Sequence, residues 1–123
     1  MDKINDVSIV IEEKEISPSQ DVHGKVKVNY TGRFDTLVIN SQIENSNDIF
    51  NYTTLNGKKL NYPYARLSIF KEELDNKSML DFSAATTHVP SAEFSNAKFR
   101  VSIIQEHKEV VSDTGFIKIK RSS

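Results

Sequence analysis

The chain has 123 residues, of which 27% are charged, and its formal net charge is −1. This balance excludes the broad basic face that nucleic acid requires and the polybasic stretch of a membrane anchor. The absence of cysteine excludes disulfides, thiolate zinc sites and cysteine nucleophiles. A chain of this length can bury a core of its own, so we expect one domain over residues 1–123.

The N-terminal residues 1–6 are polar and precede only five mostly apolar residues. A signal peptide needs a longer apolar run, and a membrane helix needs about 20 apolar residues. We therefore expect a cytoplasmic protein without stable membrane insertion.

Two stretches far apart in the sequence alternate between apolar and polar residues. Residues 22–30 place valines, Gly24 and a tyrosine on one face and lysines on the other. Residues 97–104 repeat the design, with Phe99 and Val101 on the apolar face. Successive strand side chains point to opposite faces, so each stretch predicts a strand with one buried side.

The other expected strands are shorter and are separated by turn residues. Asn56-Gly57 is a hairpin dipeptide, and Pro63 indicates an edge position for the segment around it. Residues 12–15 are expected as a solvated charged segment, residues 108–114 as a charged hairpin loop, and residues 71–77 as a polar segment with room for one helical turn. The expected strands are 7–12, 22–30, 36–43, 49–55, 58–64, 65–70, 79–86, 97–107 and 115–121. Seven to nine short strands indicate an all-β fold, an immunoglobulin-like antiparallel β-sandwich.

Chemical signatures are scarce. His23, His88 and His107 lack the short spacing of metal ligands, so we interpret them as surface histidines. A group of acidic residues lacks the spacing and glycine bend of a calcium loop, and we interpret it as a solvated loop; its members are Glu72, Glu73, Asp75 and Asp81. No serine occupies a Gly-x-Ser-x-Gly elbow, and there is no Gly-rich phosphate loop. We expect no enzyme, no cofactor and no metal.

Two groups of side chains are candidates for partner binding. The first is basic and falls on the polar faces of three expected strands: Lys25, Lys27, Lys98, Arg100, Lys118, Lys120 and Arg121. If those strands are neighbours, the group forms one basic patch suited to an anionic ligand or a phosphorylated peptide; the alternative is ordinary solubilising charge. The second is aromatic, with Tyr62 and Tyr64 beside Tyr52 and Pro63. This aromatic group either packs in the core or at a strand edge, or forms an exposed surface on which a peptide binds.

Gly24 stands out because glycine on the apolar face of a strand loses side-chain packing. We favour a β-bulge at this position. The alternative is a close approach of residues 7–12 that a partner strand can exchange.

The string from Ile16 to Val28 resembles the opening of arrestin-type N-terminal domains, and residues 82–94 and 97–104 resemble later strands of that family. The resemblance implies an immunoglobulin-like adaptor or scaffold without catalysis. Three departures limit it. The chain has length for one sandwich instead of two. The paired lysines that sense receptor phosphate on the family's first strand are missing, and Glu12-Glu13 stand nearby instead. The turn reads Pro-Ser-Gln instead of Pro-Gly-Glu. Phosphoreceptor recognition and its residues are therefore not carried over.

These observations predict a non-enzymatic protein-binding adaptor or scaffold module. A partner would add a strand to an exposed edge or dock on the basic sheet face, and self-association stays open. An alternative is an immunoglobulin-like carbohydrate-binding or cell-surface adhesion module, secreted and using aromatics near Tyr62 and Tyr64. A third, a small hydrolase or metal-dependent enzyme, is not favoured because the sequence shows no constellation of catalytic residues.

Overall fold

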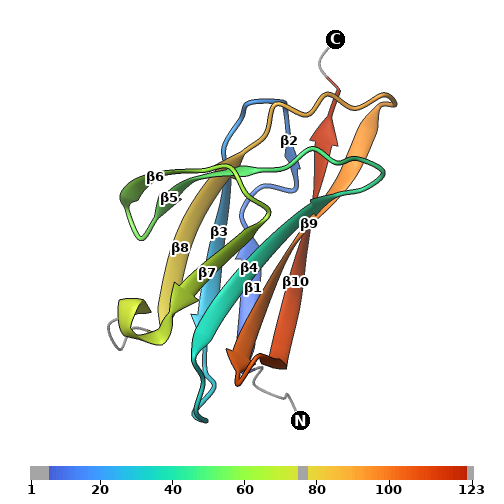
Figure 1. Ribbon diagram of the computed structural model, residues 1–123. Coiled ribbons are helices and arrows are strands. Elements are labelled where there is room, and N and C mark those ends of the chain that lie inside the picture. The colour runs from blue at the N-terminus through green and yellow to red at the C-terminus, as the bar shows by residue number, and fades with distance from the viewer. Residues whose placement is uncertain (1–5, 75–77, 122–123) are drawn as a thin grey trace.

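The computed structural model describes residues 6–74 and 78–121 and has two five-stranded sheets packed face to face (Figure 1). The first sheet has the order β1-β3-β8-β5-β6 and the second β2-β10-β9-β4-β7. The strand bounds of the first sheet are β1 Val7–Ile11, β3 Val22–Val28, β8 Met79–Ala85, β5 Asn51–Leu55 and β6 Lys58–Tyr62. Those of the second are β2 Glu15–Ile16, β10 Lys108–Lys120, β9 Phe94–Gln105, β4 Thr36–Ile43 and β7 Arg66–Phe70. The predicted all-β, immunoglobulin-like sandwich is confirmed.

The chain changes sheets near its N-terminus. β1 pairs antiparallel with β3, and β2 then pairs parallel with β10, with Glu15 opposite Lys118 and Ile16 opposite Ile119. Glu15 is exposed, as expected for a solvated charged segment, although it belongs to this short strand. The buried side chain of Ile16 anchors this short strand in the core.

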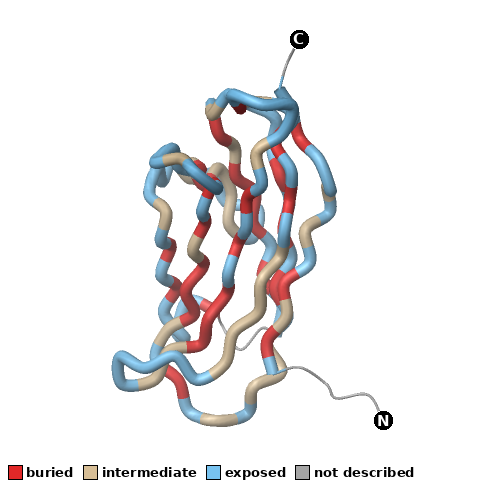
Figure 2. The backbone as a smooth tube through the Cα atoms, turned by 90° about the vertical axis from the view of Figure 1, so that its right-hand side faces the viewer, coloured by how far each residue is buried: buried red, intermediate tan, exposed pale blue. Residues whose placement is uncertain are grey.

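Side chains of both sheets meet in one core, and buried and exposed residues alternate along most strands (Figure 2). Phe99 and Val101 face this core, as predicted. The Phe99 ring lies 4.8 Å from Phe50 and 5.4 Å from Phe82, centroid to centroid. Aromatic pairs at such separations add about 0.5–1.5 kcal/mol each beyond the area that they bury.

The longest hairpin differs from the expectation. Glu106 and His107, both with positive φ, form a two-residue turn, and β10 begins at once with Lys108. The predicted loop over residues 108–114 is therefore wrong, and Gly115 lies inside β10. At this end of the hairpin, both faces of β10 are partly exposed. Its charged side chains therefore show no alternation of apolar and polar residues, and the sequence resembles that of a loop. The turn at Asn56-Gly57 is confirmed, again with positive φ at both residues.

Gly24 does not mark a β-bulge. β3 pairs with β1 and with β8 in regular register throughout, and Gly24 stands opposite Ile11 on one side and Phe82 on the other. The space that a side chain would fill at residue 24 is taken by the Phe82 ring. The expected close approach comes from a side chain rather than from a backbone.

The segment around Pro63 follows β6, which is an edge strand as predicted. Lys71–Leu74 form one 3-10 turn, η1. The remaining residues of the expected polar segment, 75–77, lie outside the described residues. Within the described ranges, no helix has the length and apolarity needed to cross a membrane.

Candidate functional site

The basic residues do not form one patch. Lys25 and Lys27 project from β3 in the first sheet, whereas Lys98 and Arg100 project from β9 in the second. Each pair alternates with buried residues of its own strand, so the two pairs point outward from opposite sides of the sandwich. The condition for a single patch, that these strands are neighbours, is not met, because β3 pairs with β1 and β8 rather than with β9 or β10.

Two of these cations already have carboxylate partners. Lys25 Nζ lies 3.6 Å from Glu12 Oε1. Arg100 donates to both carboxylate oxygens of Glu109, at 3.2 Å from Nε and 2.6 Å from an Nη atom, and Ser102 Oγ donates to the same carboxylate. These bonds, from Arg100 first and then from Ser102, hold the pKa of Glu109 below its ordinary value. A paired guanidinium is a weaker anchor for an incoming anion, because the existing bonds must break first.

The outer surface of the second sheet carries a compact group of aromatic, amide and basic side chains, which we name the Phe116 face. In register, Phe116 stands opposite Lys98, Lys98 opposite Gln42, and Lys118 opposite Asn96. Residues directly opposite on neighbouring strands share a face. Lys118 Nζ lies 5.3 Å from the ring centroid of Phe94, a cation–π contact. The Phe116 face consists of Gln42, Phe94, Asn96, Lys98, Phe116 and Lys118.

Phe116 is 72% exposed, more than any other large hydrophobic side chain of the described residues. It stands between two shallow hollows of about 360 and 470 Å³ that both include Asn96, Ala97 and Phe116 in their walls. Gln42, Glu44 and Lys98 line the first hollow, and Lys14, Glu15 and Lys118 line the second. An aromatic ring flanked by hydrogen-bonding groups is the composition typical of a binding surface.

The tyrosine pair lies elsewhere, at the β6 edge of the first sheet. Tyr62 stands opposite the buried Tyr52, with ring centroids 6.4 Å apart, and Tyr64 lies 4.9 Å from Tyr62. Tyr62 thus extends the core to the sheet edge, as the packing interpretation expects. Tyr64 is exposed beyond it, and its use as a surface on which a peptide binds stays a prediction.

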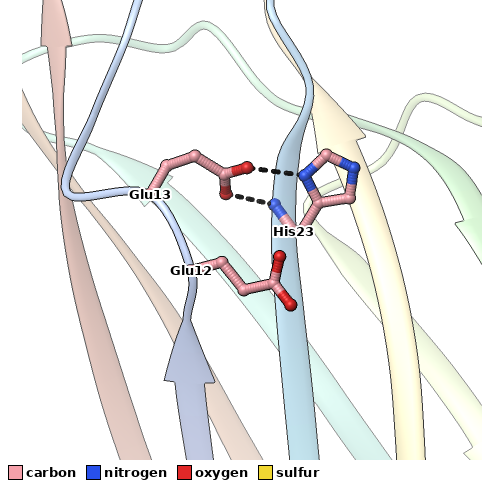
Figure 3. Close-up of side chains that lie close together, drawn as sticks. All are labelled: Glu12, Glu13 and His23. Atoms are coloured by element: carbon pink, nitrogen blue, oxygen red, sulfur yellow. Dashed lines mark hydrogen bonds and ion pairs between the residues drawn. The ribbon is translucent and has the colours of Figure 1, made fainter.

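A cluster of Glu12, Glu13 and His23 joins the end of β1 to β3 (Figure 3). The backbone N–H of His23 donates to Glu13 Oε1 at 2.7 Å, and ring Nδ1 lies 2.6 Å from Glu13 Oε2. Three carboxylate and imidazole groups this close invite a metal interpretation. However, both Glu13 oxygens and one Glu12 oxygen already have partners, the latter being Lys25. The cluster is therefore explained as a link between two strands.

The expected surface position holds for His23 and His107 but not for His88, whose side chain is only 10% exposed. Its ring lies between Asp48 and Ser95, with one ring nitrogen within hydrogen-bond distance of each. Of the four acidic residues predicted to form a solvated loop, Asp75 lies outside the described residues. Glu72, Glu73 and Asp81 are exposed, and Glu73 accepts a bond from the N–H of Phe70.

No protein-family model matches the sequence of this chain. A comparison with curated protein sequences also found no match. Among solved structures, it resembles the CFA/I adhesin CfaE of enterotoxigenic E. coli, at 13% identity and a TM-score of 0.61, over 96% of this chain and 49% of that one. It also resembles the reeler domain of human F-spondin, at 9% identity and a TM-score of 0.54, over 94% and 90%. A third, AvmM, is described as catalysing macrocyclization in alchivemycin A biosynthesis, and matches at 7% identity and a TM-score of 0.53, over 98% and 92%. Identities this low establish the shared β-sandwich fold alone.

Proposed function

We propose that this chain is a binding module that presents the Phe116 face to a protein partner, acting as an arrestin-like adaptor or scaffold. The observation that carries the proposal is the exposure of Phe116 in a face where Lys98 and Lys118 stand nearby. Burial of one large apolar side chain yields about 1.5–3 kcal/mol, and aromatic residues are enriched among the energetic centres of protein interfaces. The resemblance to an adhesin and a reeler domain is in keeping with a binding role, but AvmM shares the fold, so the face and not the fold supports this choice.

Lys98 and Lys118 line the two hollows together with the carboxylates of Glu44 and Glu15, so the proposed interface has a rim of mixed charge. Charges at a rim steer association and fix orientation more than they add affinity. A partner surface with an apolar centre and charges complementary to this rim suits this face best. Strand addition is the second route, and β7 offers an edge of the same sheet for it.

The test is affinity capture from the native cell with the native chain and with Phe116→Ser, comparing each recovered protein quantitatively. Phe70→Ser is the matched control because Phe70 is also an exposed phenylalanine, on β7 of the same sheet. We expect at least one partner to be retained by Phe70→Ser and lost by Phe116→Ser, with both variants folded by circular dichroism. Equal recovery of every partner by Phe116→Ser would contradict the proposal.

A carbohydrate ligand is the second candidate, favoured by the side-chain amides of Gln42 and Asn96, which line one hollow with Phe116. Asn96 Nδ2 already donates to Glu44 Oε2 at 3.0 Å. A flat ring with amide groups around it suits a sugar, which offers C–H groups to the ring and hydroxyls to the amides. A glycan array probed with the native chain and Phe116→Ser separates the candidates. Binding of a defined glycan that Phe116→Ser abolishes would favour this second candidate over a protein partner.

A further inference from the structure

His88 lies in the connection between β8 and β9, at the end of the sandwich where the connection between β4 and β5 also lies (Figure 1). Its ring nitrogen Nδ1 is 2.7 Å from Asp48 Oδ2, and the opposite nitrogen Nε2 is 2.9 Å from Ser95 Oγ. A carboxylate only accepts hydrogen bonds, so Nδ1 carries the proton that Asp48 accepts. In the neutral ring Nε2 is then the acceptor for the Ser95 hydroxyl. This is the relation of acid, base and nucleophile that activates a serine.

The surrounding chain holds His88 in place. The buried hydroxyl of Thr86 accepts the backbone N–H of His88 at 3.1 Å and donates to the carbonyl of Ile49 at 2.9 Å, so one side chain ties the two connections together. Ser46 Oγ accepts the backbone N–H of Asp48 at 2.9 Å, which holds the backbone of Asp48, and it also lies 3.4 Å from His88 Nδ1. The hydrogen bond from the His88 ring lowers the pKa of Asp48, which keeps this residue an acceptor.

Ser95 and His88 also line a cavity of about 320 Å³ that is open to solvent. This volume lies at the small end of ligand pockets, so it suits a short acyl group rather than a long chain. Val89 and Phe94 supply an apolar wall. Asn45 lines the same cavity and carries a side-chain amide, a donor type that stabilises an oxyanion.

We propose that Asp48, His88 and Ser95 form an acyl-transfer site for small carboxylic esters. Ser95 Oγ attacks the ester carbonyl carbon and its proton passes to His88 Nε2. The C–O bond to the alcohol breaks, the alcohol takes that proton, and the acyl group stays on Ser95 as an ester. Water then attacks this ester with His88 as base, which releases the carboxylic acid and restores the serine hydroxyl. Asp48 acts as a positioning residue because it fixes the ring through Nδ1.

This inference goes beyond a binding role and does not depend on partner binding at the Phe116 face, although Phe94 and Asn96 belong to that face and also line this cavity. It also tests the expectation that the chain is not an enzyme. Sequence reasoning missed the site because Asp48 and His88 are 40 residues apart and no motif surrounds Ser95. Only the packing of two connections at one end of the sandwich brings the three together.

The experiment treats the folded native chain with a fluorophosphonate probe and locates the adduct by peptide mass spectrometry. We expect a single adduct on Ser95, lost in Ser95→Ala and retained in Ser91→Ala, because Ser91 lines the same cavity without a bond to the His88 ring. Asp48→Asn should slow labelling by about tenfold or more, since the amide no longer fixes the ring as a carboxylate does. Asp48 is exposed, so this variant should stay folded.

Hydrolysis of p-nitrophenyl acetate provides a second readout, with Ser95→Ala expected to abolish the turnover of the native chain. Phe70→Ser should leave both labelling and hydrolysis unchanged, because no residue of β7 lines this cavity. A folded native chain without an adduct on Ser95 would overturn the inference. So would labelling of Asp48→Asn at the native rate, which would assign the three residues a purely structural role in joining the connections.

Discussion

The ring of Phe82 covers Gly24 from the neighbouring strand. A Cβ atom at residue 24 would lie 2.4 Å from two atoms of this ring, a distance at which the ring must move. Phe82 cannot move freely because its ring packs 5.4 Å from Phe99 and 6.0 Å from Tyr52, centroid to centroid. The glycine therefore provides the space that an aromatic core residue occupies.

We predict that Gly24→Ala lowers the free energy of unfolding by about 1–3 kcal/mol, the usual cost of overpacking a core. Phe82→Leu should also destabilise the protein, but the double variant should lose less than the sum of the two losses, since the smaller side chain vacates the space. Urea denaturation of the four proteins measures this coupling. Strict additivity would show that the ring does not respond to the new methyl group. Binding per folded molecule should not change in Gly24→Ala.

Phe99 and Lys98 are neighbours with opposite surroundings. Phe99 is fully buried among Phe50, Phe82 and Tyr52, whereas Lys98 lies on the outer surface. Phe99→Ala should therefore cost about 3–5 kcal/mol, and Lys98→Ala less than about 0.5 kcal/mol. Chemical denaturation measures both values. Equal and small losses would mean that the faces of β9 are reversed.

Strands with one apolar face could be predicted from the sequence, because burial imposes a period of two on residues such as Phe99 and Val101. The strand over residues 108–114 could not, because its side chains are partly exposed on both faces and carry no such period. The sequence placed Phe116, Lys118 and Lys120 on one face, but their meeting with Lys98 and Gln42 depends on strand order. Strand order follows from long-range pairing, which local patterns do not encode.

β1 is an edge strand of the first sheet, and the side chain of Asp113 in β10 accepts a hydrogen bond from one backbone N–H of that strand. The backbone N–H of Ile9 donates to Asp113 Oδ2 at 2.9 Å, across the gap between the sheets. Asp113→Ala leaves this partly buried N–H without its acceptor, which should cost about 1–3 kcal/mol. Asp113→Asn retains an acceptor oxygen and should lose less.

Amide hydrogen exchange of Ile9 is the direct measurement for this hydrogen bond. We expect faster exchange in Asp113→Ala than in the native protein, and an intermediate rate in Asp113→Asn. Unchanged exchange in Asp113→Ala would show that this N–H stays protected without the carboxylate. The bond also weighs against exchange of β1 by a partner strand, since an incoming strand would have to displace it.

The pair of His23 and Glu13 should make stability depend on pH. The hydrogen bond to Glu13 raises the pKa of His23 above its ordinary value of 6.5. Partial burial alone would raise the pKa of Glu13, but bonds from the His23 backbone N–H and ring outweigh it and hold this pKa below 4.5.

A raised histidine pKa stabilises the folded state fully below pH 6.5, and this contribution is lost as the pH rises through the folded pKa. A lowered carboxyl pKa stabilises it above pH 4.5, and this contribution is lost as the pH falls through the folded pKa. The pair therefore contributes most between pH 4.5 and 6.5. Because His23 is half exposed, we expect a contribution under about 1 kcal/mol.

The measurement compares the native chain with His23→Gln by urea denaturation at about pH 5.5 and about pH 8.5, on either side of the expected His23 titration. Glutamine keeps the backbone N–H bond to Glu13 and removes only the titrating ring, so the difference between the proteins reports the ring alone. We expect His23→Gln to be less stable at the lower pH and nearly equal to the native chain at the higher one. Lys27→Gln, on the same face of β3, is the control and should show a difference that does not vary in this way. A His23→Gln difference of the same size at both pH values would show that the His23 ring has the same pKa in the folded and unfolded protein, and thus that the bond to Glu13 does not raise it.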